Sequence, residues 1–568
     1  MARGLLLCCV FVAACGDPEP ERPNVLVVTI DTLRPDAVGV GTPALNAFFA
    51  EATRFRGART VAPLTLPAHS AIFTGLLPAH NGMHDNVNEP LPPRDQRPFP
   101  LLAEQFKDAG YATAGFAARA VLAAPTGIGR GFDLYDCPTT EIEWQEEGGS
   151  IPAEERIRAP LAWIDGLAPG KPWFVWVHFF DPHAPYLPFK GDAQRAPSRE
   201  TDSNEARYRG EARRVDAALE KLLAAVGKDT VVVVASDHGE GLDDHGEPTH
   251  GPLCYGSTID VLLAVRAKGF ARGADDIGLR SVADVAPTLR RLCTLPQADT
   301  DGRDLAGPPH ETLVAESLFT WAIHGWGQVF AVTDGDFCLI ESGSSLELYD
   351  RRADHGEMVP LPLNRPAYEK LDRALERFRS QKTGGAGGDL VGSVPPYGEL
   401  RRRDTGYLSR HENAKLLDPR AYLRYWAVLE GILPLVQNCT ARRDASPLVA
   451  ALRTIDEIQK HTPQSPRVDH YRACVQAALG EITGVPARYG EAAWSELAAI
   501  EKGYVQEATV VPAITYAVAA SDADALRMLV RLLNRSPRDL GPDVERALTD
   551  ALKKLGVTEE LFLVPPIR

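Results

Sequence analysis

The chain contains two apolar runs that end in acidic residues, Asn24-Val-Leu-Val-Val-Thr-Ile-Asp31 and Thr230-Val-Val-Val-Val-Ala-Ser-Asp237-His238. Nearly continuous β-branched runs of this length are typical of strands buried on both faces of a parallel sheet. A carboxylate at the end of such a strand costs free energy unless it is paired or binds a metal. Ligands of parallel sheets bind beyond the carboxyl ends of the strands. The two runs therefore predict an α/β sheet with Asp31 and Asp237 at its ligand-binding edge.

Strands and helices alternate on both sides of these runs. Two further apolar runs predict strands, at Ala112–Ala118 and Trp173–His178. Four segments have the apolar spacing of helices: Pro43–Ala52, Pro100–Ala109, Ala153–Leu167 and Glu205–Val226. This alternation predicts a parallel, doubly wound α/β sheet.

The pattern changes after residue 312. Three short runs separated by turn residues predict a small antiparallel sub-sheet, at Val329–Thr333, Phe337–Ile340 and Leu346–Tyr349, followed by a helix at Arg365–Arg379. From residue 419 to 562 nearly all of the chain has a helical period, for example Pro447–His461, Glu491–Lys502 and Ala523–Leu533. This all-α region fits either a tetratricopeptide-like array of helix pairs or an irregular bundle. We place domain boundaries after residues 22 and 410, which gives segments 1–22, 23–410 and 411–568.

A hydroxyl group stands at the predicted start of another helix. Thr65 precedes Pro67, and proline suits the first turn of a helix. The free N–H groups and the dipole at a helix start would stabilise a deprotonated Thr65 oxygen. The alternative is that Thr65 merely caps the helix.

Histidine and acidic residues cluster after the second run. His238, His245 and His250 lie in one short loop with several acids, and Asp and His together suit Zn²⁺ or Mn²⁺. Asp181 and His183 follow the strand at Trp173–His178, so they line the same cleft or belong to a rigid proline-rich turn.

Composition and the N-terminus restrict the partners and the location. The 568-residue chain has a net charge of −15 and no long basic run, which makes nucleic acid an unsuitable partner. The apolar run Gly4–Ala14 is too short to span a bilayer and fits a signal peptide. The segment Val12-Ala-Ala-Cys15 resembles a bacterial lipobox. It predicts a lipid anchor at Cys15 and a place in the bacterial cell envelope, at the outer membrane and facing the periplasm or the exterior; an ordinary signal peptide is the alternative.

Taken together, the motifs resemble the sulfatase family of the alkaline-phosphatase superfamily, from about Pro23 to Leu408. Other matching segments are Thr42-Pro-Ala-Leu-Asn46, Gly75-Leu-Leu-Pro-Ala-His80-Asn-Gly82, Gly131-Phe-Asp-Leu-Tyr135, Asp284-Val-Ala-Pro-Thr-Leu289 and Arg403-Asp-Thr-Gly406. The resemblance implies that residues 23–410 form a hydrolase domain for sulfate or phosphate mono- or diesters.

The nucleophile position departs from sulfatases proper. Those enzymes convert a Cys or Ser to formylglycine ten residues before the Gly of a Thr-Gly pair, and here that position is Thr65, which cannot follow this route. The same position is Thr in the nucleotide pyrophosphatase/phosphodiesterase relatives and in the phosphoethanolamine and lipoteichoic-acid transferases. The resemblance therefore implies a Thr65 nucleophile that is activated directly by a metal.

The resemblance also implies the other roles at the site. Asp31, Asp237 and His238 match the ligands of one divalent metal, Zn or Mn rather than Ca, and His183 and His250 would stabilise the substrate oxygens. A second metal is disfavoured, because the spacing of Asp181 and His183 differs from the Asp-x-x-x-His of the two-metal relatives.

Two other functions are carried as alternatives. The first is a transferase that moves a phospho-substituent onto a glycan or lipid; the second is a degenerate sulfatase that serves as a scaffold. Whichever function applies, the helical region would offer a surface for a protein partner.

Overall fold

The computed structural model describes residues 22–86, 90–91, 99–138, 151–186, 203–324 and 326–380, and beyond residue 417 only separate pieces, of which 446–461 and 542–556 are the longest. The chain divides into two compact units. The first comprises residues 1–240, 256–313 and 384–386, and the second comprises 241–255, 314–383 and 387–568. The domain boundaries after residues 22 and 410 remain predictions, and the leader with Cys15 lies outside the described residues.

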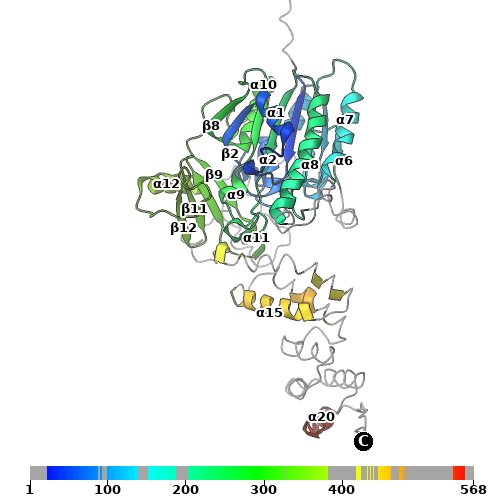
Figure 1. Ribbon diagram of the computed structural model, residues 1–568, viewed down its shortest axis with the longest axis vertical. Coiled ribbons are helices and arrows are strands. Elements are labelled where there is room, and N and C mark those ends of the chain that lie inside the picture. The colour runs from blue at the N-terminus through cyan, green and yellow to red at the C-terminus, as the bar shows by residue number, and fades with distance from the viewer. Residues whose placement is uncertain are drawn as a thin grey trace, which may run out of the picture. The chain divides into compact units, whose positions relative to one another are not determined.

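The first unit is built on an eight-stranded sheet within the described residues (Figure 1). The strands stand in the order β4-β3-β5-β1-β6-β7-β2-β8. Their bounds are β1 Val25–Ile30, β2 Thr53–Arg59, β3 Ala112–Phe116, β4 Leu134–Asp136, β5 Trp173–Phe179, β6 Val231–Ser236, β7 Leu263–Arg266 and β8 Ala274–Ser281. Central β1 pairs in parallel with both β5 and β6, as the sequence predicts, whereas β7 runs antiparallel to β6 and β2. The sheet is therefore mixed.

Helices cover both faces of this sheet. Val25 and Val27 of β1 belong to the apolar cluster under α2 (Thr65–Thr74), α4 (Leu102–Asp108) and α10 (Val285–Leu292). Leu26 and Val28 point to the opposite face. They pack in the cluster under α1 (Pro43–Glu51), α6 (Ala153–Arg156), α7 (Arg158–Asp165) and α8 (Asn204–Ala225). This double cover explains why β1 and β6 are buried at every position.

The predicted helix at Ala153–Leu167 is two helices, α6 and α7, separated at Ile157. Pro160 lies in the first turn of α7, and its missing N–H removes the bond that would reach back to the carbonyl of Arg156. The four strands predicted within the sheet, and the other three helices, are confirmed to within two residues.

Four strands of the sheet were not predicted: β2, β4, β7 and β8. Edge strand β8 exposes alternate residues along its first half, and Arg54 of β2 pairs with Asp275 of β8, with the Arg54 Nε and Asp275 Oδ1 2.8 Å apart. Polar strands of this kind lack the continuous apolar run on which the prediction depended.

The second unit contains the predicted sub-sheet. Its strands stand in the order β12-β11-β10-β9, and β10, β11 and β12 are antiparallel. The bounds are β9 Leu313–Ser317, β10 Val329–Thr333, β11 Phe337–Ser342 and β12 Ser345–Asp350, followed by helix α12 at Pro366–Ser380. Other α-helices of the described residues are α3 Pro78–Asn81 and α9 Gly256–Ile259 in the first unit, and α11 Phe319–His324, α15 Ser446–His461 and α20 Pro542–Leu555 in the second.

The C-terminal region is helical where it is described, in α15 and α20. The helices predicted at Glu491–Lys502 and Ala523–Leu533 lie outside the described residues, and so does the choice between a repeat array and a bundle. Among the described residues, no helix is both long enough and apolar enough to cross a membrane.

A buried carboxylate joins α8 to the start of α1. Asp216 of α8 accepts the backbone N–H groups of Ala44 and Leu45, at 3.0 and 2.8 Å. We expect Asp216→Ala to lower the free energy of unfolding by about 2–3 kcal/mol, because two buried donors lose their acceptor. Urea denaturation measures this loss. Glu220→Ala removes an exposed charge from the same helix and should change the free energy by less than about 0.5 kcal/mol; equal losses in the two variants would contradict the assignment.

Candidate active site

Two carboxylates meet at the carboxyl ends of the central strands. Ile30 pairs with Ser236 in the register of β1 and β6, so Asp31 and Asp237, the next residues, leave the sheet side by side. Asp237 Oδ1 accepts the backbone N–H of His238 at 2.8 Å and that of Thr32 at 3.2 Å. These bonds turn the other oxygen of Asp237 toward Asp31.

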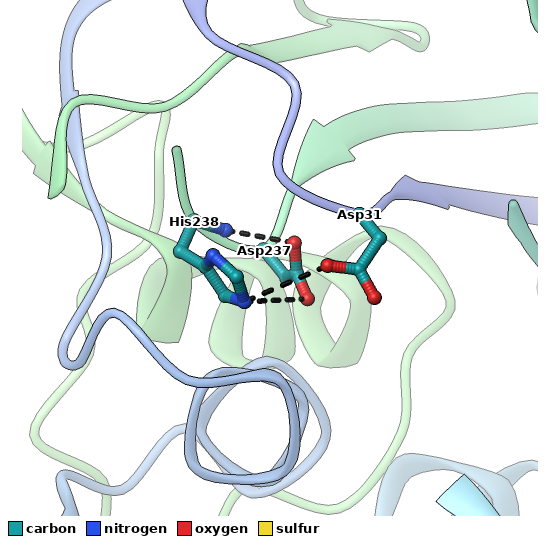
Figure 2. A group of neighbouring side chains, drawn as sticks. All are labelled: Asp31, Asp237 and His238. Atoms are coloured by element: carbon teal, nitrogen blue, oxygen red, sulfur yellow. Dashed lines mark hydrogen bonds and ion pairs between the residues drawn. The ribbon is translucent and has the colours of Figure 1, made fainter. Parts of the chain in front are cut away.

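His238 faces both carboxylates (Figure 2). Its Nδ1–H donates to the carbonyl of Gly239 at 3.0 Å, which leaves Nε2 on the side of the carboxylates, where it can bind a metal ion through its lone pair. Nε2 lies 3.6 Å from Asp31 Oδ1 and 3.6 Å from Asp237 Oδ2. Three electron-pair donors thus converge on one point, and one ligand atom from each residue lies within 4.8 Å of the others.

The surroundings leave this cluster short of positive charge. Asp31, Asp237 and His238 are fully buried. Among the described residues, no donor bonds to either oxygen of Asp31 or to Oδ2 of Asp237. Burial, and then the charges of Asp237 and Glu240, raise the pKa of the Asp31 carboxyl well above its usual range. Two buried carboxylates with three oxygens that lack a donor, beside an imidazole nitrogen, fit a divalent metal ion.

Thr65 stands at the edge of the cluster. Helix α2 begins at Thr65, after Leu64 in an extended conformation, as the sequence predicts. The Thr65 Oγ1 lies 3.4 Å from His238 Nε2, and the residue is 2% exposed. The hydroxyl therefore lies both at a helix N-terminus and against the Nε2 of His238.

His183 is half-buried and stacks on Phe180, with ring centroids 4.2 Å apart. Its Nδ1–H donates to the carbonyl of Ala184 at 2.5 Å. The guanidinium of Arg119 lies 4.5 Å from the centre of the Phe180 ring. The charge of Arg119 also acts on Asp31, where it opposes the raised pKa that burial and the neighbouring acids produce. Arg119 is a cation near the site to which the sequence prediction gave no role.

Asp181 does not face the cluster as a candidate ligand would. Its Oδ1 accepts a hydrogen bond from Arg214 at 2.9 Å, and its Oδ2 accepts the backbone N–H of Ala153 at 3.1 Å. Both oxygens are engaged with α6 and α8, and the number of metal ions remains a prediction.

The other two histidines of the loop belong to the second unit. His245 donates to the carbonyl of Gly356 at 2.9 Å and stacks on Tyr255 with ring centroids 3.6 Å apart. This is a packing role within that unit. The role of His250 remains a prediction.

Three buried polar residues near the cluster were given no role by the sequence prediction: Thr29, His69 and His178. His178 Nε2 lies 3.6 Å from Asp31 Oδ2, and His69 Nδ1 lies 3.6 Å from Asp237 Oδ2. The sequence did contain a sign of their importance, since Thr29 and His178 are polar residues inside fully buried strands. His69 lies one helical turn after Thr65, on the same face of the helix.

Comparisons with known proteins place this site in a family. A family model described as Sulfatase matches residues 23–294. The Delta 4,5-hexuronate-2-O-sulfatase of Bacteroides thetaiotaomicron is 22% identical over 434 residues, which cover 63% of this chain and 89% of that protein. Residues 23–294 thus form a domain of the sulfatase family. As a member of this family and of the alkaline-phosphatase superfamily, it is an ester hydrolase.

Solved structures share the fold of this sulfatase-family chain. A phosphonate monoester hydrolase from Silicibacter pomeroyi matches with a TM-score of 0.51 and 20% identity, covering 63% of this chain and 94% of that one. A protein solved in complex with its substrate D-Glucosamine-2-N, 6-O-disulfate matches with a TM-score of 0.53 and 19% identity, covering 63% and 98%. The predicted family and fold class are confirmed, whereas the roles of the individual site residues remain predictions.

The cost of the buried Asp31 carboxylate can be measured directly. In the presence of chelator at pH 7, we expect Asp31→Asn to raise the free energy of unfolding by about 1–3 kcal/mol, because the amide is neutral and can donate to a neighbour. The folded chain holds the Asp31 proton more tightly than the unfolded chain does, so the carboxylate lowers stability as the pH rises from ~4 through its folded pKa. The increase in the free energy of unfolding caused by Asp31→Asn should therefore vanish near pH 3.

The control is Asp275→Asn on β8. The hydrogen bond from Arg54 lowers the pKa of Asp275, so the stability that this carboxylate contributes is present at neutral pH and is lost in acid. We expect Asp275→Asn to leave stability unchanged or slightly lower at pH 7. Destabilisation of the metal-free protein by Asp31→Asn at pH 7 would contradict the account of the cluster.

Proposed function

We propose that the chain hydrolyses sulfate or phosphate esters with Thr65 as the nucleophile, at a divalent metal held by Asp31, Asp237 and His238. The observation that carries this proposal is the position of the Thr65 Oγ1, 3.4 Å from His238 Nε2 at the first residue of α2. A hydroxyl in this place adds a fourth oxygen or nitrogen to a buried cluster in which three carboxylate oxygens have no hydrogen-bond donor among the described residues.

The donor set suits Zn²⁺ or Mn²⁺ better than Ca²⁺. Calcium prefers six to eight oxygen ligands, whereas this cluster combines an imidazole nitrogen with two carboxylates and a hydroxyl. A bound ion would lower the pKa of the Thr65 hydroxyl and polarise the ester.

The residues of the chain then act on the ester. The Thr65 Oγ1 forms a bond to sulfur or phosphorus as the bond to the leaving oxygen breaks, and water afterwards releases the covalent ester from Thr65. The N-terminal N–H groups of α2 favour the negative charge that accompanies this step. His183 and Arg119, which both stack on Phe180, would orient the oxygens of the bound ester, and His250 is proposed to assist them.

The relatives suggest a sulfate ester of a saccharide as the substrate class. One relative is named as a hexuronate sulfatase, and a structural neighbour was solved with a glucosamine disulfate. A phosphate or phosphonate ester is the second candidate, because Thr stands at the nucleophile position and a phosphonate monoester hydrolase shares the fold. The transferase and scaffold alternatives have no comparable support.

We also propose that the enzyme is tethered through Cys15 at the bacterial cell envelope. The support is the lipobox-like sequence before Cys15 and the polar segment after it. Incorporation of labelled palmitate into the parent chain, and none into Cys15→Ser, is the expected result; equal labelling of the two would exclude this anchor.

The nucleophile is tested by substitution. We expect Thr65→Ala to lower kcat by at least about 10³-fold at unchanged metal content, because no other hydroxyl takes its place. Thr65→Ser should retain activity within about tenfold. Thr74→Ala removes another buried hydroxyl from the far end of α2 and should leave kcat within about threefold. Full activity in Thr65→Ala would refute the mechanism.

The substrate class is tested with the parent protein. 4-Nitrophenyl sulfate, 4-nitrophenyl phosphate, bis(4-nitrophenyl) phosphate, a phenylphosphonate ester and sulfated disaccharides are assayed with Zn²⁺, Mn²⁺ and Ca²⁺ added in turn. We expect turnover of one class with Zn²⁺ or Mn²⁺ and little with Ca²⁺. Turnover supported only by Ca²⁺ would overturn the assigned metal.

A further inference from the structure

We propose that the hydroxyl of Tyr208 is a positioning group for the metal site, because it holds a strained turn at Thr32 that aims the two carboxylates at one point. This role rests on the metal site of the proposed function. Tyr208 lies in α8 and is 1% exposed, so it acts on the site from within the core rather than through the substrate.

The turn that follows β1 is strained. Thr32 has a φ of 56°, in the left-handed region that β-branched residues rarely adopt. Its side chain does not compensate for this cost, because Oγ1 is buried and has no hydrogen-bond partner among the described residues. Such a backbone conformation persists only where the surrounding contacts impose it.

Contacts on both sides of Thr32 impose this conformation. The N–H of Thr32 donates to Asp237 Oδ1 at 3.2 Å, and the carbonyl of Thr32 accepts the hydroxyl proton of Tyr208 at 2.7 Å. The same Tyr208 oxygen accepts the backbone N–H of Arg34 at 2.7 Å. A carbonyl can only accept and a backbone N–H can only donate, so the direction of both bonds at the phenol is fixed. The Tyr208 hydroxyl therefore closes the turn from Thr32 to Arg34.

The turn directs both carboxylates of the cluster. Asp237 Oδ1 is held by the N–H groups of Thr32 and His238, and this leaves Oδ2 for the cluster. A change of φ at Thr32 to a negative value would rotate the peptide that joins Asp31 to Thr32 and withdraw the Thr32 N–H from Asp237. Relaxation of the turn would therefore loosen Asp31 and Asp237 together.

Helix α8 is a firm support for this hydroxyl. Val215 of α8 packs in the same apolar cluster as Val28 of β1, the strand that leads into the turn. Asp216, eight residues after Tyr208, binds the two N–H groups at the start of α1, which follows the turn. The helix thus fixes the chain before and after the turn, and Tyr208 reaches the turn from a fixed place.

Removal of the hydroxyl should weaken metal binding. Tyr208→Phe keeps the ring in the core and removes both hydrogen bonds to the turn. We expect the affinity for Zn²⁺, measured by competition with a chromogenic chelator, to fall about 10-fold or more, because the turn can relax. The control is Tyr135→Phe on edge strand β4, which removes a hydroxyl that donates to the carbonyl of Leu122 at 2.6 Å. Its affinity for Zn²⁺ should stay within about twofold of the parent.

A second substitution separates this role from general packing. Glycine adopts a positive φ without steric cost, so Thr32→Gly removes the need for a contact that imposes the turn. In a chain that carries Thr32→Gly, the further change Tyr208→Phe should lower the Zn²⁺ affinity less than about threefold. A hydroxyl that only stabilised α8 would have the same effect with either residue at position 32.

The same four proteins can be compared without a metal. In urea with chelator, we expect Tyr208→Phe to lower the unfolding midpoint at most about half as much in the presence of Thr32→Gly as in its absence. This measurement needs neither substrate nor metal, so it tests the constraint on the turn independently of the proposed function.

The outcomes are distinct. Parent-like Zn²⁺ affinity in Tyr208→Phe, or equal losses with and without Thr32→Gly, would overturn the role of Tyr208 while leaving the metal site intact. If Tyr208→Phe does not fold, recovery of folding by Thr32→Gly supports the role and failure to recover overturns it. A parent protein that binds neither Zn²⁺ nor Mn²⁺ would overturn the proposed metal site and, with it, the role of Tyr208 in metal binding. Normal ester cleavage in Thr65→Ala would overturn the nucleophile and leave the role of Tyr208 standing.

Discussion

The site at the ends of β1 and β6 depends on the repulsion between two carboxylates that are buried side by side. Asp31 and Asp237 are fully buried, and the described residues offer no donor to Asp31. Two like charges in such an environment are stable only with a proton or a cation between them. The parallel pairing of β1 with β6 creates this juxtaposition, because the register that aligns Ile30 with Ser236 brings the next residue of each strand to the same edge.

The rest of the first unit holds this arrangement in place. Apolar clusters on both faces of β1 leave its backbone little freedom, and α2 is packed so that its first residue reaches the cluster. Imidazole rings surround the carboxylates where an ordinary core would place apolar side chains. His238 turns its Nε2 toward both carboxylates, and His178 turns its Nε2 toward Asp31, each at 3.6 Å. Electrostatic strain is thus concentrated at one point of a well-packed sheet, a distribution typical of sites that bind and activate a ligand.

The sequence predicted those parts of the site that leave a local pattern along the chain. Val25–Ile30 and Val231–Ser236 are continuous apolar runs, so the strands and the acids after them could be located without a structure. Thr65 could be placed because proline two residues later indicates a helix start. The antiparallel strand β7 and the polar edge strand β8 could not be found in this way, since their residues follow their neighbours in space rather than a period along the chain.

The same limit applies to Thr29, His69 and His178. Each is a single polar residue within an apolar segment, and its meaning depends on contacts across 40 to 149 positions of sequence. Asp181 illustrates the converse, because its neighbours in sequence favour a place in the cleft whereas its actual partner, Arg214, lies on α8.

The central claim is that the Asp31, Asp237 and His238 cluster is completed by a cation. Anomalous X-ray diffraction from crystals grown with Zn²⁺ or Mn²⁺, recorded on both sides of the absorption edge of the metal, tests it most directly. The account predicts an anomalous peak bounded by Asp31 Oδ1, Asp237 Oδ2 and His238 Nε2, next to the Thr65 hydroxyl. A crystal without a peak there, in which the two carboxylates share a hydrogen bond instead, would contradict it.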